Sequence, residues 1–335
     1  MLELTNKGFY CAAGDFYVDP WRPVDNAVIT HAHSDHARAG STRYLCAAPG
    51  ETVLRARLGD ISLQTLRYGE TVSLKDARVS LHPAGHILGS SQVRIEVGGR
   101  VACLSGDYKT VGDLTAAPFE PVACDLFVTE ATFALPIYRW QPDGSLFGAI
   151  NKWWAENADA KRASVLYGYA LGKAQRLLSG LDASIGPILT HGAVERLVGC
   201  YREAGVSLPP TRYAGTALKE DFARALVVAP PSANGSPWVR RFGDFSTALA
   251  SGWMAIRGAR RRRAVDYGFP LSDHADWPGL LEAIRSTGAE EVWVTHGYTG
   301  PLARWLEERG VKSRALHTQF EGEILEEAVP EEAPA

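Results

Sequence analysis

Residues 28–40, VITHAHSDHARAG, place three histidines and an aspartate within six positions, directly after β-branched residues. The chain has only nine histidines, so His31, His33 and His36 beside Asp35 concentrate side chains that bind metals. Neighbouring side chains in a strand-to-helix turn point apart, which makes it hard for this run to surround one ion. It can serve two ions, with His31 and His33 on one and Asp35 and His36 on the next. The alternative is a polar loop that is merely rich in histidine.

Several short apolar runs end abruptly in polar residues, as buried strands do where they reach a loop. Functional side chains of layered α/β folds gather at such strand ends. The runs NAVIT, RVACLS, DLFVT and EVWVT lead into His31, Asp107, Glu130 and His296. Four such coincidences favour a functional site.

Helical spacing of apolar residues fills the intervals between these runs. It predicts helices over 148–160, 172–181, 193–205, 217–226, 277–288 and 301–310, and a proline-rich loop over 229–238. Strands and helices alternate throughout, so we expect an α/β protein with two layered parts. A composition of 46% hydrophobic and 22% charged residues is typical of globular proteins.

Charge is segregated along the chain. The segment from Arg139 to Arg263 holds 18 of the 35 basic residues but only 9 of the 38 acidic ones. The middle of the chain is therefore basic, and the segments on either side of it are acidic. This pattern favours a polyanionic substrate. The N-terminus does not resemble a secretory signal, and no apolar run is long enough to cross a membrane, so we expect a cytoplasmic protein with no membrane partner. The five cysteines are scattered, which predicts reduced thiols.

Further ligands for two ions are available elsewhere. HPAGHILGSSQ offers His86, LSGDYK offers Asp107 and VTHGYTG offers His296. Two ions about 3.5–4 Å apart form a clamp for in-line displacement at phosphorus. Asp15 and Asp19 in GDFYVDP could orient ligating histidines, although turn-forming aspartates look the same.

The run HAHSDH resembles the signature of the metallo-β-lactamase fold. AGHILGSS, SGDYK, TEATFAL, SDHADW and THG follow in the order found in its nucleic-acid-cutting β-CASP branch, over about residues 8–320. That branch includes Artemis-type DNA nucleases and RNA 3′-end-processing endonucleases. The segments around residues 10–40 and 251–281 most resemble bacterial ligase-associated DNA exonucleases.

The resemblance implies a role for each matched residue. One metal, Zn²⁺ or Mn²⁺, would be held by His31, His33 and His86, a second by Asp35, His36 and His296, with Asp107 as the bridge. The ions would lower the pKa of a bridging water and deliver hydroxide at neutral pH. Glu130 would orient His274, the expected general acid or phosphate contact.

The resemblance also implies the domain organisation. We expect a metallo-β-lactamase αββα sandwich from residues 1–140 and 265–325, an inserted β-CASP-like substrate-binding domain over 141–264, and an acidic tail over 326–335. In the insertion, YGYALGKAQRLL suggests that Tyr169, Lys173 and Arg176 contact substrate, and Arg257 with Arg260–Arg263 could contact phosphate.

The expected activity is metal-dependent phosphodiester hydrolysis, with exonucleolytic trimming of DNA, from the 5′ end by analogy, during end repair. DNA is the expected partner, with an ATP-dependent ligase and a helicase as further partners implied by the resemblance. An RNA nuclease or mRNA 3′-end-processing factor is the main alternative. A lactamase or thioesterase-type hydrolase and a non-catalytic DNA-end-binding module are further alternatives, disfavoured by the basic insertion and the complete ligand set.

Overall fold

The computed structural model describes residues 1–256 and 264–319. It divides the described residues into two units, one of Met1–Arg139 with residues 274–319, the other of Trp140–Asp273. The acidic tail and the basic run Arg260–Arg263 lie outside the described residues. The expected second boundary at 264 differs from the division after Asp273, because the strand Tyr267–Phe269 still pairs within the second unit.

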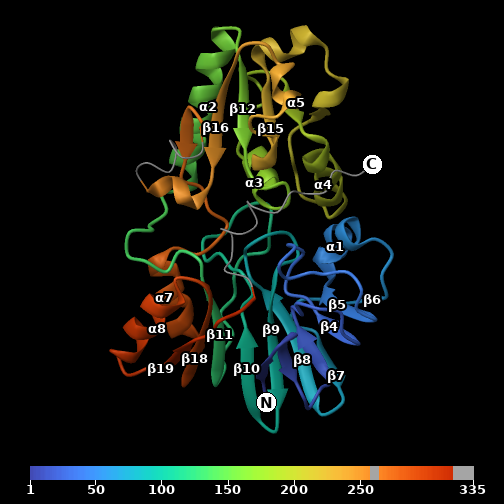
Figure 1. Ribbon diagram of the computed structural model, residues 1–335, viewed down its shortest axis with the longest axis vertical. Coiled ribbons are helices and arrows are strands. Elements are labelled where there is room, and N and C mark those ends of the chain that lie inside the picture. The colour runs from blue at the N-terminus through green and yellow to red at the C-terminus, as the bar shows by residue number, and fades with distance from the viewer. Residues whose placement is uncertain (257–263, 320–335) are drawn as a thin grey trace. The chain divides into compact units, whose positions relative to one another are not determined.

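The first unit contains two sheets, each part antiparallel and part parallel (Figure 1). One has the order β1 (Glu3–Thr5), β2 (Gly8–Cys11), β3 (Phe16–Val18), β4 (Asn26–Val28), β5 (Arg43–Ala47) and β6 (Leu63–Leu66). The other has the order β19 (Lys312–Ala315), β18 (Glu291–Gly297), β11 (Leu126–Ala131), β10 (Arg100–Leu104), β9 (Ser91–Val97), β8 (Ala77–Pro83) and β7 (Thr71–Leu74). Strands β10, β11, β18 and β19 run parallel, so their carboxyl ends meet at one edge.

Strand β11 contributes side chains to two hydrophobic clusters, one on each face of its sheet. Successive side chains point to opposite faces of a sheet. Leu126 and Val128 therefore join the cluster between the two sheets, while Phe127 and Ala131 pack with the helices outside the second sheet. These helices are α7 (Trp277–Thr287) and α8 (Thr299–Glu307).

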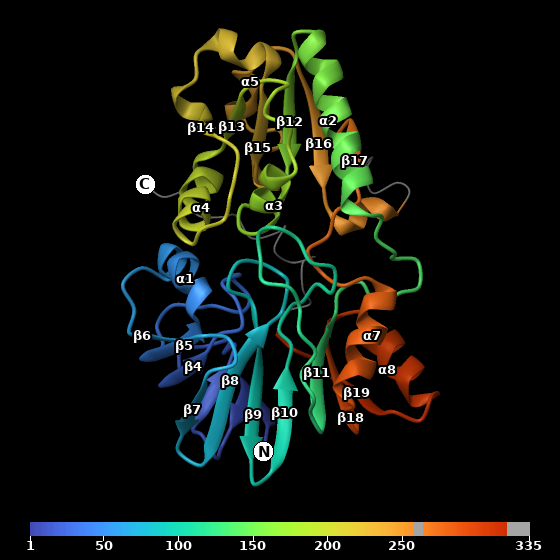
Figure 2. The same ribbon diagram turned by 180° about the vertical axis from the view of Figure 1, so that it is seen from behind.

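The helices of this unit lie at its two sides. Figures 1 and 2 show α7 and α8 beside β18 and β19, and α1 (Glu51–Leu58) beside β5 and β6. The Asp276 side chain caps α7 by accepting a hydrogen bond from the Gly279 amide. The layers are those expected of an αββα sandwich.

The second unit is built on a six-stranded parallel sheet. Its order is β14 (Arg212–Tyr213), β13 (Ile188–Thr190), β15 (Leu226–Ala229), β12 (Ala163–Tyr167), β16 (Phe245–Ala250) and β17 (Tyr267–Phe269). Every residue of β12 and β15 is buried, as in parallel strands covered on both faces. The helices are α2 (Asp143–Asp159), α3 (Lys173–Ser179), α4 (Gly192–Glu203) and the short α5 (Pro237–Arg240).

The predicted α-helix over 217–226 is wrong. The structure has a 3₁₀ helix at Lys219–Arg224, and Leu226 already begins β15. The β-branched pair Val227–Val228 is completely buried in the parallel sheet, and this tertiary packing overrides the helical spacing before it. The other five predicted helices correspond to α2, α3, α4, α7 and α8.

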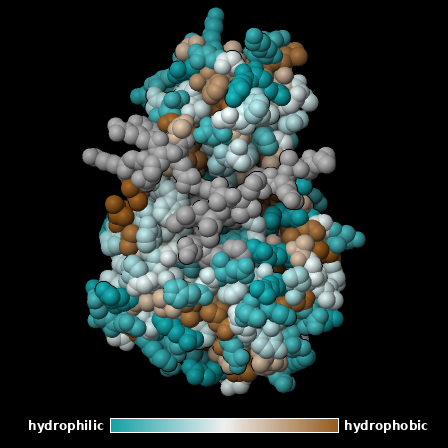
Figure 3. All heavy atoms as spheres, viewed as in Figure 1, coloured by the Kyte–Doolittle hydropathy of each residue, from teal (hydrophilic) through white to brown (hydrophobic). Residues whose placement is uncertain are grey.

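The surface visible in Figure 3 is mostly hydrophilic, with apolar side chains in small scattered groups. None of the helices within residues 1–256 and 264–319 combines the length and apolar character that crossing a bilayer requires.

Candidate metal centre

The HAHSDH run follows β4 and turns sharply at once. The amides of His36 and Ala37 both donate to the His33 carbonyl, and Arg57 of α1 donates to the Ala32 carbonyl at 2.5 Å. The turn directs His31 and His33 to one side and Asp35 and His36 to another, into separate candidate ligand groups. The sequence predicts the same division, and metal binding by these four residues stays a prediction.

Three imidazole nitrogens converge in the first group. His33 Nδ1 lies 3.1 Å from both His31 Nε2 and His86 Nε2. A ring nitrogen carries either one hydrogen or one lone pair, so His33 Nδ1 cannot satisfy both contacts as good hydrogen bonds. Nitrogens bound tetrahedrally to one zinc ion at about 2.0–2.1 Å would lie about 3.3 Å apart. The spacing therefore fits a shared cation.

Asp107 lies between the two groups. Its Oδ2 is 3.6 Å from His31 Nε2, 3.9 Å from His86 Nε2 and 3.5 Å from His36 Nε2. Burial raises the pKa of Asp107, but His36, His274 and His31 outweigh it and hold that pKa well below its usual range. An ionised carboxylate between two imidazole groups is what a bridging ligand requires.

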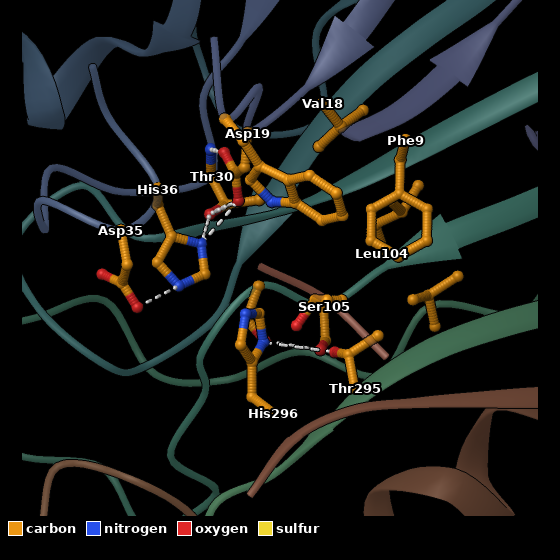
Figure 4. A pocket seen from close by; sticks show the side chains of 14 residues that line it. Phe9, Val18, Asp19, Thr30, Asp35, His36, Leu104, Ser105, Thr295 and His296 are labelled. Atoms are coloured by element: carbon orange, nitrogen blue, oxygen red, sulfur yellow. Dashed lines mark hydrogen bonds and ion pairs between the residues drawn. The ribbon is translucent and has the colours of Figure 1, made fainter. Parts of the chain in front are cut away.

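Asp35, His36 and His296 form the second group, with ligand atoms within 4.8 Å of one another. His36 Nε2 is 3.4 Å from Asp35 Oδ2 (Figure 4). Asp35 Oδ1 and His36 Nε2 are buried without a hydrogen-bond partner among the described residues, a costly arrangement that a cation would relieve. Burial lowers the pKa of His36. The carboxylates of Asp35, Asp107 and Asp19 outweigh this effect and raise that pKa well above its ordinary value, because they attract the positive charge of the protonated ring.

A β-bulge aims His296 at this group. Thr295 pairs with Glu130 and Gly297 with Ala131, so His296 is the extra residue of β18. His296 and Gly297 both have positive φ, 50° and 79°. A Cβ on Gly297 would lie 2.5 Å from the Ala131 carbonyl oxygen, so this close approach requires glycine. Such local strain is typical of functional sites.

Hydrogen bonds to Nδ1 orient three of the candidate ligand imidazoles. Asp19 Oδ2 is 2.7 Å from His36 Nδ1 and accepts the Thr30 hydroxyl at 2.6 Å. Thr30 Oγ1 then accepts from His31 Nδ1 at 3.1 Å. The Thr295 hydroxyl donates to the Thr129 carbonyl and can likewise accept from His296 Nδ1. In each case these partners favour Nδ1 as the donor, so Nε2 is the nitrogen that faces a metal.

Of the two aspartates suggested as orienting residues, Asp19 contacts a histidine of the candidate ligand groups. Asp15 instead contacts the Tyr10 hydroxyl and Lys75 Nζ on the surface. Thr30 and Arg57 were not predicted, because a threonine inside a strand run and an arginine on a helix carry no signal of a site in the sequence.

Glu130 and His274 form a buried pair beside the first group. His274 Nδ1 lies 3.0 Å and 2.9 Å from the two carboxylate oxygens of Glu130, and the Tyr108 amide donates to Glu130 Oε1 at 2.7 Å. The His274 ring lies 4.7 Å from that of His86 between centroids, with the two ring planes tilted by 50°. Glu130 and His274 also form a third possible ligand group with Asp107.

A pocket of about 440 Å³, which includes space open to solvent, reaches the second group from the interior of the sandwich. Asp35, His36 and His296 lie at one end, and Figure 4 shows Phe9 and Leu104 at the other. The pocket gives this ligand group an apolar neighbourhood on one side.

The structure buries two of the three residues expected to contact substrate. Lys173 and Arg176 are 1% and 5% exposed, and their charges face carboxylates of their own unit, Asp273 for both and Asp143 for Arg176. Tyr169 is half-buried, with Lys173 Nζ 4.9 Å from its ring centre. His82 contacts Ser80 and belongs to no candidate ligand group among the described residues.

The first unit has two packed sheets with histidine–aspartate groups at their strand ends, and its chain is interrupted by a second unit built on a parallel sheet. These features define the metallo-β-lactamase fold in its β-CASP form. No protein-family model matches the chain. Over 314 residues, 93% of the chain, it is 34% identical to a protein named "Probable DNA ligase" from Opitutus terrae. It is also 30% identical to "Endoribonuclease YSH1" of Yarrowia lipolytica over 124 residues, and 28% identical to "Cleavage and polyadenylation specificity factor 73" of Drosophila melanogaster over 123, each 36% of the chain.

The chain spans only part of these relatives: 30%, 14% and 18% of their lengths, respectively. A crystal structure of a protein of unknown function from Enterococcus faecalis superposes with a TM-score of 0.62, covering 89% of this chain and 80% of that one at 12% identity, which shows the shared fold alone. The chain is thus homologous to the β-CASP branch. The relatives do not single out the Artemis-type members.

Proposed function

We propose that this chain is a metal-dependent phosphodiesterase that hydrolyses nucleic acid. The observation that carries the proposal is the position of Asp107 Oδ2 within 3.5–3.9 Å of histidines from both ligand groups. A shared carboxylate between two imidazole groups fits a pair of divalent cations, Zn²⁺ or Mn²⁺. Bound there, such ions supply a hydroxide nucleophile at neutral pH and neutralise charge on the phosphodiester.

The chain's own residues divide the remaining work. His31, His33, His86, Asp35, His36, His296 and Asp107 would hold the ions. His274, oriented by Glu130 through Nδ1, would give a proton from Nε2 to the oxygen that leaves phosphorus. The P–O bond to this leaving oxygen would be replaced by a bond to a water-derived oxygen, and His274 would regain its proton from solvent.

The preferred substrate in this proposal is DNA, trimmed from an end, with the 5′ end attacked first. The ligase-named relative supports a role in end processing beside an ATP-dependent ligase, and a helicase is a further proposed partner. The five cysteines are all free thiols, in keeping with a proposed site of action in the cytoplasm. Tyr169 is proposed to contact the polymer.

An RNA endonuclease is the second candidate, favoured by similarity to proteins named endoribonuclease. Purified protein incubated with end-labelled DNA and RNA, each single- and double-stranded, across Mn²⁺, Zn²⁺, Mg²⁺ and chelator separates the two. Faster release of mononucleotides from DNA, first from the 5′ label, supports the proposal. A circular single strand cut as fast as a linear one would favour an endonuclease, and no cleavage under any condition would refute the proposed activity.

A further inference from the structure

The second unit contains a buried cluster of opposite charges around α3. Lys173, Arg176 and Asp273 are each at most 5% exposed, and Asp143 is partly exposed beside them. Arg176 Nη1 lies 2.9 Å from Asp273 Oδ1, Arg176 Nη2 lies 2.7 Å from Asp143 Oδ1, and Lys173 Nζ lies 3.8 Å from Asp273 Oδ2. All four residues belong to the same unit.

Stability gives little reason for such a cluster. Removing charges from water is costly, and a buried ion pair commonly contributes no more stability than well-packed apolar side chains of similar volume. What a planar guanidinium does supply is a fixed geometry, because it donates several hydrogen bonds in set directions. The question is which atoms Arg176 fixes.

Arg176 fixes the backbone immediately before His274. Its Nη1 donates to the Ser272 carbonyl at 2.5 Å as well as to Asp273. It therefore holds both the main chain and the side chain of the two residues that precede the histidine.

The residue after His274 is held as well, within the first unit. The Ala275 amide donates to the Tyr108 carbonyl at 2.7 Å, and the Tyr108 amide donates to Glu130 Oε1. The same peptide segment thus binds both Ala275 and the carboxylate that orients the His274 ring. Hydrogen bonds therefore hold the residues before His274 within the second unit and the residue after it within the first.

We infer that Arg176 is a positioning residue for His274, supported by Lys173 through Asp273, and that it makes no contact with substrate. The inference rests on the proposed function, in which His274 donates the proton to the leaving oxygen. Displacement of the histidine by a fraction of an ångström would slow that transfer and leave the two proposed metal-binding groups in place, because His274, Arg176 and Asp273 belong to neither of them.

The leaving group provides the readout. A nucleoside 3′-oxygen needs protonation as it leaves, whereas p-nitrophenolate, a weak base, leaves without it. A poorly placed His274 should therefore slow cleavage of DNA far more than hydrolysis of thymidine 5′-(p-nitrophenyl phosphate). A variant that is merely less well folded should slow both alike.

The experiment compares the full chain with Arg176→Met, Arg176→Lys and the control Arg162→Met on both substrates. Arg162 is a matched control, because it also bonds within the second unit, to Asn157 Oδ1, and lies outside the cluster. For Arg176→Met we expect kcat on DNA to fall about 10- to 100-fold, the scale of a small misplacement of a reacting group. KM, metal content and turnover of the p-nitrophenyl ester should stay within about threefold of the parent values, a small part of a full general-acid effect. Arg176→Lys should recover part of the kcat on DNA that Arg176→Met loses.

Equal losses on the two substrates, or no loss on DNA, would overturn the inference. A raised KM with kcat unchanged would make Arg176 a phosphate contact and overturn it too. Should Arg176→Met fail to fold, Asp273→Asn keeps the side-chain shape and removes the charge, and the same selective loss on DNA is expected. A parent protein inactive on both substrates would instead refute the proposed function, so the two failures are distinguishable.

Discussion

His274 Nδ1 lies 2.9 Å from Glu130 Oε2, although 144 positions separate the two residues in the chain. Both side chains are buried, Glu130 at 1% exposure and His274 at 4%. A buried carboxylate on one nitrogen of an imidazole fixes the orientation of the ring and stabilises its protonated form. Because Nδ1 contacts Glu130, the other ring nitrogen, Nε2, is the one that can bind a further group.

The first prediction concerns this pair. His274→Ala should slow nucleic-acid hydrolysis about 10²- to 10⁴-fold, the usual contribution of a general acid. Metal content, measured on the purified variant, should stay at the parent value. Loss of one ion would show that His274 is a ligand, as its grouping with Asp107 and Glu130 also permits.

The second prediction concerns the bridge. Asp107→Ala should abolish cleavage, because Asp107 Oδ2 lies 3.6 Å from His31 Nε2 and 3.5 Å from His36 Nε2, one histidine of each group. Metal analysis should find about two ions per parent chain and fewer in the variant, as expected of a two-metal site. Asp107→Asn, which keeps the shape without the charge, separates the loss of charge from the loss of packing. Retained activity in the alanine variant would exclude the two-metal assignment.

The third prediction tests the residue behind His36. Asp19→Asn should weaken metal binding about 10- to 100-fold, the usual effect of losing an outer partner of a ligand. Asp15→Asn is the matched control, since Asp15 lies in the same segment but contacts Tyr10 and Lys75 on the surface. Titration with a competing chelator measures both. The same affinity for the two variants would contradict the role of Asp19.

The fourth prediction concerns the bulge at His296. Gly297→Ala places a Cβ 2.5 Å from the Ala131 carbonyl in a left-handed conformation, so β18 must shift locally. We expect lower activity and weaker binding of an ion at the Asp35–His36–His296 group. Gly288→Ala also has positive φ, 64°, but meets no atom within 4 Å, and it controls for the backbone strain alone. Similar metal binding in both variants would count against a role of the bulge in aiming His296.

The fifth prediction is a pH effect on stability. The hydrogen bond from Lys312, which lies opposite Glu291 in the β18–β19 register, lowers the pKa of Glu291 with help from Trp293. Because the pKa is lower folded than unfolded, the stabilisation is complete above the unfolded pKa and disappears as the pH falls through the folded one. Glu291→Gln should therefore cost about 0.2–1 kcal/mol at pH 7, as partly exposed pairs do, and less at an acid pH below the unfolded pKa. Urea unfolding at the two pH values measures this, and an equal cost at both would contradict it.

Much of the site could be predicted because its information is local. The spacing in HAHSDH divides four candidate ligands between two groups without reference to the rest of the chain. Apolar runs that end in Asp107, Glu130 and His296 identify strand ends, since side-chain alternation and strand length are properties of short segments. Parallel pairing of β10, β11 and β18 then brings those ends to one edge of a sheet.

Only the tertiary structure decided which residues support the ligands and which cations are buried. Asp19 and Asp15 look alike in the sequence, but the contact of Asp19 with His36 depends on how β3 and β4 lie side by side. The sequence around Lys173 and Arg176 predicts a phosphate-binding turn. In the structure both side chains are instead buried against Asp273, which lies almost a hundred positions further along the chain. A sequence pattern reports periodicity and local spacing. Burial and pairing of a charge depend on surfaces that meet only when distant segments fold together.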